Sequence, residues 1–114
     1  MDDCIFCQII NKKIPAEIVY DNDRIIAFKD VKPQAPVHIL IIPKIHISTL
    51  NDLLPEQTKL IGELIQVSKK LAKSESIDQR GYRVNFNCNE DGGQTVYHIH
   101  LHLLGGRAFS WPPG

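Results

Sequence analysis

The chain has 114 residues, with 13 basic and 13 acidic side chains, and 43% of its residues are hydrophobic. That length suits one domain, spanning residues 1–114, with a real core. Balanced charge argues against a general surface for nucleic acid polymers, although it leaves open the binding of a single nucleotide. The apolar run at 37–42 is far shorter than the roughly 20 residues that cross a bilayer, so we expect no membrane partner.

The cysteines and the N-terminus indicate a compartment. Residues 1–4 are acidic in character, and no apolar run of signal-peptide length follows them. The chain has 3 cysteines, an odd number that suits a reducing compartment better than a disulfide framework. We therefore expect a cytoplasmic protein.

The first element is predicted to be a short helix that begins near Cys4-Ile-Phe-Cys7 and ends between Lys12 and Pro15, because apolar residues recur there at helical spacing. The C-x-x-C pair has three interpretations. A redox motif of the thioredoxin type would follow a strand, and no strand precedes this one. The pair could also be two buried thiols, or half of a zinc site that needs two more ligands.

A hairpin is predicted next, from Glu17–Asp21 and Arg24–Lys29, around polar turn residues. Two prolines then make the loop 30–36 stiff and extended. Asp30 begins this loop. Its carboxylate could cap the loop locally, or it could accept hydrogen bonds from the hydroxyls of a ligand, and spacing alone does not separate these roles.

The run Val37–Ile42 is apolar on both faces and predicts a central strand that Pro43 ends. His38 lies at its start, where a lone histidine is more often a hydrogen-bonded core residue. His46 follows in a predicted turn or short helical segment at 44–49 and could be an ordinary surface residue. The one long helix is predicted at Pro55–Lys73, with an apolar stripe that covers one face of the sheet. The stripe consists of Leu60, Ile61, Leu64, Ile65, Leu71 and Ala72.

A second informative strand is predicted at Tyr82–Asn89, where apolar side chains alternate with a row of asparagines. Asparagine is poor strand material, so this row is best explained if it faces the same polar site as the histidines described next. The following loop, Glu90–Gln94, contains Gly92-Gly93. Two glycines let the backbone approach a phosphate, but Asp-Gly-Gly is also an ordinary hairpin turn.

The most informative segment is Thr95–Gly105, which we predict to be one continuous strand. Residues two apart in a strand point the same way, so His98, His100 and His102 should share one face. Three alternating imidazoles favour a catalytic site, with metal chelation or plain structural burial as alternatives. The tail 106–114 contains Phe109 and Trp111, which are costly to leave in water and so should pack on something.

These motifs together resemble the histidine triad (HIT) family, and within it the Hint branch of nucleotide-binding phosphoramidases. The resemblance rests on His98-Ile-His-Leu-His-Leu-Leu104, the preceding Asp-Gly-Gly-Gln, Pro-Gln-Ala-Pro-x-His at His38, Ile-Pro-Lys-x-His at His46 and the terminal Trp-Pro-Pro-Gly. It implies an α+β fold with a five-stranded antiparallel sheet, one long and one short helix. It also implies a homodimer with a continuous ten-stranded sheet, in which the tail 106–114 lies near the partner's active site.

The resemblance also implies hydrolysis of purine nucleoside 5′-phosphoramidates, such as adenosine 5′-monophosphoramidate, to AMP or GMP and an amine. His100 would be the nucleophile and form a nucleotidyl-histidine intermediate, His102 would contact the phosphate and leaving group, and His38 would support them. Substrate binding is implied for Asp30, Val31, Asn87, Gly93, Gln94, Thr95 and Trp111. Hint proteins commonly have serine where this chain has Thr95.

The chemistry of the residues agrees with this. A neutral imidazole can attack phosphorus, and a second imidazole can protonate the departing amine, with no metal needed. Two other functions stay open: a non-catalytic nucleotide-binding regulatory module, and a dinucleoside polyphosphate hydrolase. A structural zinc ion is predicted at Cys4, Cys7, His46 and His98, because C-x-x-C supplies two thiolates. His98 also lies ~13 Å along the predicted strand from His102.

Overall fold

Five β-strands form one antiparallel sheet in the order β1-β2-β3-β5-β4, in a computed structural model that describes residues 3–114. The elements in chain order are α1 (Ile5–Ile10), β1 (Ile18–Asp21), β2 (Ile25–Lys29), β3 (Val37–Pro43), the 3₁₀ turns Leu50–Asp52 and Pro55–Gln57, α2 (Thr58–Ser74), β4 (Tyr82–Asn85) and β5 (Leu101–Gly105). The predicted α+β fold, with one long and one short helix, is confirmed. The ten-stranded sheet of a dimer stays a prediction.

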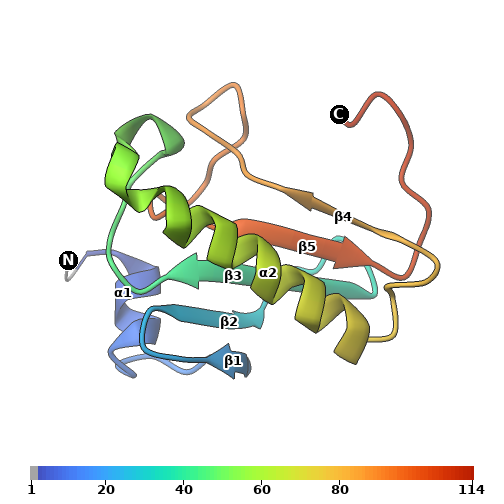
Figure 1. Cartoon of the computed structure of the whole chain (residues 1–114), viewed down its shortest axis with the longest axis horizontal. Helices are drawn as coiled ribbons and strands as arrows, with labels where there is room; N and C mark the ends of the chain where they lie inside the picture. The colour runs from blue at the N-terminus through green and yellow to red at the C-terminus, as the bar shows by residue number, and fades with distance from the viewer. Residues whose placement is uncertain (1–2) are drawn as a thin grey trace.

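The two faces of the sheet are covered by different helices. Figure 1 views the sheet from the side that α2 crosses. Alternate residues of the central strands, among them Ile39, Ile41 and Leu103, pack with Leu64 and Leu71 of α2 into one buried cluster. The other set packs with α1 into a second cluster, which contains Phe6, Ile9, Ile26, Phe28, Leu40 and Ile42. Because side chains alternate along a strand, β2 and β3 each supply residues to both clusters.

The long helix begins with a 3₁₀ turn at Pro55 and becomes α-helical at Thr58, close to the prediction. Its buried residues are Leu64, Val67, Ser68, Leu71 and Ala72. The prediction that Ile65 belongs to the apolar stripe is wrong, because 42% of its surface is exposed. The buried Ser68 is tolerated because its hydroxyl donates to the Ile65 carbonyl, 2.6 Å away.

The prediction of a continuous strand over 95–105 is also wrong: β5 begins only at Leu101. Its register pairs Ile41 with Leu101, which would place Pro43 opposite Ile99. Proline has no N–H to donate, so the ladder ends there. The Ile99 N–H donates instead to the Ile47 carbonyl at 2.8 Å. The segment that carries His98 and His100 is therefore hydrogen-bonded to the loop 44–49 and not to β3. No helical turn forms in that loop.

The predicted strand 82–89 is likewise shorter, and β4 ends at Asn85, which pairs with His102 near the beginning of β5. That pairing confirms that this part of the asparagine row lies on the histidine side of the sheet. On the same edge, the tail after β5 runs beside β4 (Figure 1), where the Arg83 guanidinium donates to the Ser110 carbonyl at 2.9 Å.

The tail packs through one of its two aromatic residues. The Phe109 ring lies 4.2 Å from the Arg107 guanidinium and 5.1 Å from that of Arg83, as cation–π contacts. Trp111 is 83% exposed. Over residues 3–114, none of the helices has the length and apolar character needed to cross a bilayer.

Candidate active site and a second histidine cluster

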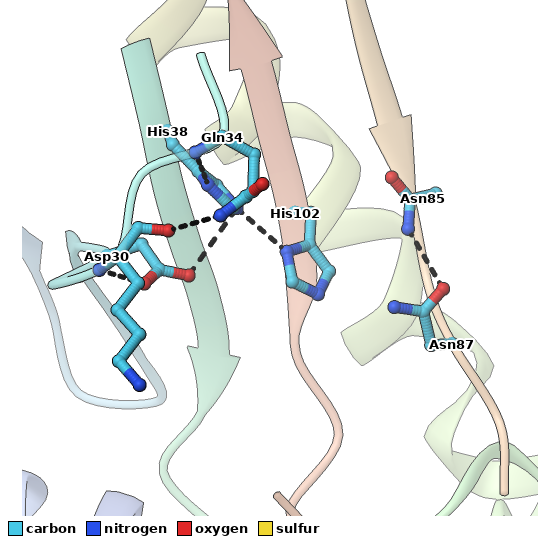
Figure 2. A network of polar contacts seen from close by, with 7 residues as sticks. Asp30, Gln34, His38, Asn85, Asn87 and His102 are labelled. Carbon is cyan, nitrogen blue, oxygen red and sulfur yellow. Dashed lines mark hydrogen bonds and ion pairs between the residues drawn. The ribbon is translucent and has the colours of Figure 1, made fainter. Parts of the chain in front are cut away.

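Two histidines on neighbouring strands form the centre of the site. His38 is the second residue of β3, and His102 lies on β5, where it pairs with Leu40. Both side chains therefore project on the α1 side of the sheet. His38 Nε2 lies 2.9 Å from His102 Nδ1, and Figure 2 shows this contact between the strands.

Backbone groups determine which nitrogens of these rings carry protons. The Gln34 N–H donates to His38 Nδ1 at 3.0 Å, so that nitrogen holds a lone pair. A neutral His38 then carries its proton on Nε2 and donates it to His102 Nδ1. The proton of neutral His102 consequently lies on Nε2. This Nε2 is buried and lacks a hydrogen-bond partner among residues 3–114. Its N–H could therefore donate to an oxygen atom of a ligand.

Asp30 lies beside this pair, directly after β2, and its carboxylate caps the loop that follows. Its Oδ1 accepts the Lys32 N–H at 2.8 Å and so caps the loop 30–36 (Figure 2). Its Oδ2 lies 3.5 Å from His38 Nε2. The carboxylate thus holds the loop and faces the histidine pair at once.

His100 has the opposite arrangement of its ring protons. Its Nδ1 lies 2.8 Å from the His98 carbonyl oxygen, which can only accept, so Nδ1 carries the proton. The lone pair of a neutral ring is then on Nε2. The His100 ring centroid lies 4.9 Å from that of His102 and 5.1 Å from that of Phe6. His100 therefore presents an available nucleophilic nitrogen between two rings.

Burial keeps these imidazoles neutral. It lowers the pKa of His100 and of His38, and the Asp30 carboxylate opposes the effect on His38 only in part. Burial, with the neighbouring His100 and His38, lowers the pKa of His102 to about 4. At neutral pH the site therefore offers a free lone pair on His100 and an N–H on His102.

A cleft of about 330 Å³ opens beside His100. It extends along α1, and its lining includes Phe6, Ile9, Phe28, Asp30, Val31 and Thr95. That volume and apolar lining suit a small organic ligand such as a nucleoside. Val31 is 91% exposed at the cleft, as a residue that packs on a base would be.

The contributions of Phe6, Ile9, Phe28 and Leu40 to the cleft were not predicted. A signal for two of them exists in the sequence. Leu40 is two residues from His38, and Phe28 is two residues from Asp30, so each shares a strand face with a predicted site residue. For Phe6 and Ile9 of α1, the place in the cleft lining follows only from the packing of the helix against the sheet.

The loop 89–95 supplies fewer free donors than its glycines suggest. The Gly93 N–H donates to the Glu90 carbonyl at 3.0 Å, and Gly93 has a positive φ of 81°. Gly92 is required by space, since a Cβ there would lie 2.4 Å from the Cys88 carbonyl oxygen. The Gly93 N–H, which was expected to face a phosphate, thus donates within the loop, and the loop conformation needs both glycines.

Gln94 is buried, and its side chain ties the loop together. Its amide nitrogen donates to the carbonyls of Ser48 and Val96, and its Oε1 accepts the Asn89 N–H. These contacts favour a supporting role over direct substrate contact. Asn87 remains available, because its Oδ1 accepts from Asn85 at 3.1 Å while its amide N–H₂ can donate elsewhere (Figure 2).

A second cluster lies at the N-terminal end of α1. His98 Nδ1 is 3.5 Å from Cys4 Sγ and 3.6 Å from Cys7 Sγ, and His46 Nδ1 is 3.5 Å from Cys7 Sγ. His98 Nε2 donates to the Pro43 carbonyl at 2.8 Å, which leaves its Nδ1 lone pair directed at the thiols. The candidate ligand atoms of Cys4, Cys7, His46 and His98 all lie within 4.8 Å of one another.

The donor set fits zinc. Two sulfurs and two imidazole nitrogens form an ordinary closed zinc set. Without a metal, burial and the neighbouring Cys4 raise the pKa of the Cys7 thiol to about 11, and burial lowers the pKa of His98 to about 4. The three remaining histidines of the chain, His38, His100 and His102, lie in the other site, so the two clusters share no side chain.

The chain is similar to several known proteins. The profile of the family described as "Scavenger mRNA decapping enzyme C-term binding" matches residues 3–110. The chain is 52% identical to the purine nucleoside phosphoramidase of Escherichia coli K12 over 106 residues, which is 93% of this chain and 89% of that protein. It is 51% identical to a HIT-like protein of Synechococcus elongatus over 113 residues, 99% of this chain and 98% of that one.

Solved structures agree with these relatives. The crystal structure of a HIT family hydrolase from Legionella pneumophila Philadelphia 1 superposes with a TM-score of 0.96 at 52% identity, covering 98% of this chain and 100% of that one. A histidine triad nucleotide-binding protein from Candida albicans gives a TM-score of 0.82 at 32% identity, covering 96% and 83%. With its fold, its triad and these relatives, the chain belongs to the histidine triad family of hydrolases.

Proposed function

We propose that this protein hydrolyses purine nucleoside 5′-phosphoramidates through a nucleotidyl-His100 intermediate, releasing AMP or GMP and an amine. The observation that carries the proposal is the pair of opposite ring tautomers. The His98 carbonyl leaves a lone pair on His100 Nε2, while the Gln34–His38 chain leaves an N–H on His102 Nε2. The relative in Escherichia coli named purine nucleoside phosphoramidase supports the substrate class.

Substrate binding follows from the surroundings of His100. The purine would lie in the apolar cleft against Val31, with the ribose hydroxyls near the Asp30 carboxylate. The phosphate would lie at the mouth of the cleft, where His102 Nε2–H, the Asn87 amide and the Thr95 hydroxyl can donate to its oxygens. Gly93 and Gln94 hold the loop that carries Thr95.

In the first step, His100 Nε2 forms a bond to phosphorus as the phosphorus–nitrogen bond of the substrate breaks. The electron pair leaves with the nitrogen, which takes a proton through His102. The His98 carbonyl stabilises the positive charge that develops on the His100 ring. In the second step, water attacks phosphorus and the bond to Nε2 breaks. The proton that water releases replaces the one that His102 gave to the amine.

We also propose that Cys4, Cys7, His46 and His98 hold a structural zinc ion. The metal would attach α1 to the loop 44–49 and to the segment before β5, and so couple metal binding to local folding. The catalytic steps involve none of these side chains.

The assembly we propose is a cytoplasmic homodimer. β1 and β4 are the two edges of the sheet, and an edge strand is a ready template for pairing. Pairing at β4 would extend the sheet to ten strands. It would also give the exposed Trp111, which belongs to the tail beside β4, a place near the partner's active site.

Two other functions use the same pocket. A non-catalytic nucleotide-binding module would bind AMP without turnover, and a dinucleoside polyphosphate hydrolase would cleave a phosphoanhydride. The free lone pair on His100 favours catalysis over binding alone.

The test is incubation with adenosine 5′-monophosphoramidate, followed by phosphorus NMR. Conversion of the phosphoramidate signal to that of AMP is the expected result. A diadenosine polyphosphate in a parallel sample separates the two enzymes. An unchanged phosphoramidate signal, with AMP binding intact, would favour the regulatory module.

A further inference from the structure

Phe6 occupies a position between the two histidine clusters. It is buried on α1, and its ring makes edge-on contacts with three other rings. The centroid distances are 5.1 Å to His100, 6.0 Å to His98 and 5.3 Å to Phe28, with interplanar angles of 90°, 68° and 71°. Perpendicular arrangements at these distances are favourable between aromatic rings.

The nucleophile needs such a neighbour because its backbone lies outside the sheet. His100 precedes β5, in a segment whose ladder ended at Pro43. One hydrogen bond, from Nδ1 to the His98 carbonyl, orients the His100 ring. A half-turn of the ring about its Cβ–Cγ bond would break this bond and direct Nε2 away from the substrate. The rings of Phe6 and His102 both contact the His100 ring, at centroid distances of 5.1 and 4.9 Å, and so restrict its rotation.

We infer that Phe6 is a positioning residue for the nucleophile, beyond its share in lining the cleft. This inference rests on the proposed function, in which His100 Nε2 attacks phosphorus while the substrate's phosphorus–nitrogen bond breaks and the amine takes a proton. Phe6 gains and loses no proton or bond. It keeps the ring of His100 in the orientation in which that attack is in line.

The test separates positioning from binding. Phe6→Leu keeps most of the apolar volume and removes the ring. We expect the rate at which saturating adenosine 5′-monophosphoramidate forms nucleotidyl-protein in a single turnover to fall about tenfold, equivalent to about 1.4 kcal/mol. The dissociation constant for AMP should change less than about threefold, since most of the cleft wall remains. Imidazole ¹⁵N spectra should change from one His100 tautomer to an average of two.

Two matched variants lie on the same helix. Ile9→Ala shortens another cleft residue that belongs to the same buried cluster and carries no ring. It should weaken AMP binding more than Phe6→Leu does and slow the single-turnover step less. Ile10→Ala removes a residue that packs on the cluster outside the cleft lining, and it should leave both constants unchanged while lowering the unfolding midpoint.

The outcomes are distinct. Wild-type single-turnover rates in Phe6→Leu would overturn the inference. Equal slowing in Phe6→Leu and Ile10→Ala would also overturn it, by showing that loss of helix packing is the cause. If Phe6→Leu does not fold, Phe6→Met serves with the same expectations. A wild-type protein that forms no nucleotidyl intermediate would instead refute the proposed function.

Discussion

The two histidine clusters use the same side chain for opposite purposes, and backbone carbonyls make the difference. At the thiol cluster, the Pro43 carbonyl accepts a hydrogen bond from His98 Nε2–H, which leaves the lone pair of Nδ1 directed toward two cysteines. At the proposed catalytic cluster, the His98 carbonyl accepts a hydrogen bond from His100 Nδ1–H, which leaves the lone pair of Nε2 available at the cleft. Two imidazoles that are two residues apart therefore face different partners.

Spacing along the chain therefore does not by itself assign chemistry to a histidine. The carbonyl that accepts a hydrogen bond from one ring nitrogen determines which nitrogen keeps the lone pair. The atoms around that lone pair determine whether it can bind a metal or attack a substrate. Sulfur atoms around Nδ1 favour a metal. An apolar cleft around Nε2 favours a substrate.

The largest effect is expected from His100→Ala. Removing the nucleophile should lower turnover of adenosine 5′-monophosphoramidate by about 10⁴-fold or more. AMP affinity should change little, because the cleft walls remain. Steady-state kinetics and calorimetry on the same preparation measure both. A His100→Ala enzyme that retains wild-type turnover would show that the nucleophile lies elsewhere.

The second effect separates the clusters. Cys4→Ser combined with Cys7→Ser should reduce the zinc content from about one per chain to none, as measured by elemental analysis. The unfolding midpoint should fall by about 10 °C, since ~2.7 kcal/mol of ligand stabilisation shifts a domain of this size by about 4 °C per kcal/mol. Most of the turnover should remain.

The matched control is Cys88→Ser, because Cys88 is the one described cysteine outside the cluster. It should keep both the metal and the midpoint. Metal-free wild type from a zinc-replete preparation would defeat the zinc proposal, and metal retained in the double variant would place the ligands elsewhere.

A smaller loss is expected from His38→Ala, which removes the N–H that fixes the tautomer of His102. Turnover should fall by about 100-fold, within the range of lost acid–base assistance. Zinc content should stay unchanged, because His38 is not part of the thiol cluster. An unchanged rate would show that His102 keeps its tautomer without His38.

Lowering the pH should destabilise the folded protein through the buried His102. Its folded-state pKa of about 4 lies below the ordinary value of 6.5, so the unfolded chain binds more protons between these values. Its contribution to stability is complete above pH 6.5 and is lost as the pH falls toward 4. The slope cannot exceed about 1.4 kcal/mol per pH unit, and partial exposure to solvent makes it smaller.

Urea titrations of wild type and His102→Asn over this range measure that slope. The proposed zinc ligands are the same in both proteins, so the difference isolates His102 with its neighbours Asp30, His38 and His100. Parallel stability curves for the two proteins would contradict the assignment.

The smallest effect is expected from deleting residues 110–114, which include Trp111. The relative rates for several leaving amines should change by a few-fold, while the unfolding midpoint should hardly move because Trp111 is exposed. Identical selectivity in the truncated and full-length proteins would count against a role of the tail near a partner's active site.

Much of this arrangement could be predicted from the sequence. The histidine motifs produced the family resemblance that implied the five-stranded fold and the roles of the histidines, and the C-x-x-C pair indicated a possible zinc site, because motifs and short ligand spacings are local properties. The end of the β3–β5 pairing at Pro43 could not be predicted from a local pattern, because it depends on the register between the two strands. The roles of Phe6 and Gln94 depend on contacts between distant segments, which no local pattern specifies.

Trapping of the covalent intermediate tests directly whether His100 is the nucleophile. Wild-type protein is mixed with adenosine 5′-monophosphoramidate, quenched in denaturant during turnover, digested and mapped by mass spectrometry. We expect one nucleotidyl group per chain on the peptide that contains His100, and none in His100→Ala. Turnover to AMP with no nucleotide on that peptide at any quench time, or with nucleotide attached to another residue, would contradict it.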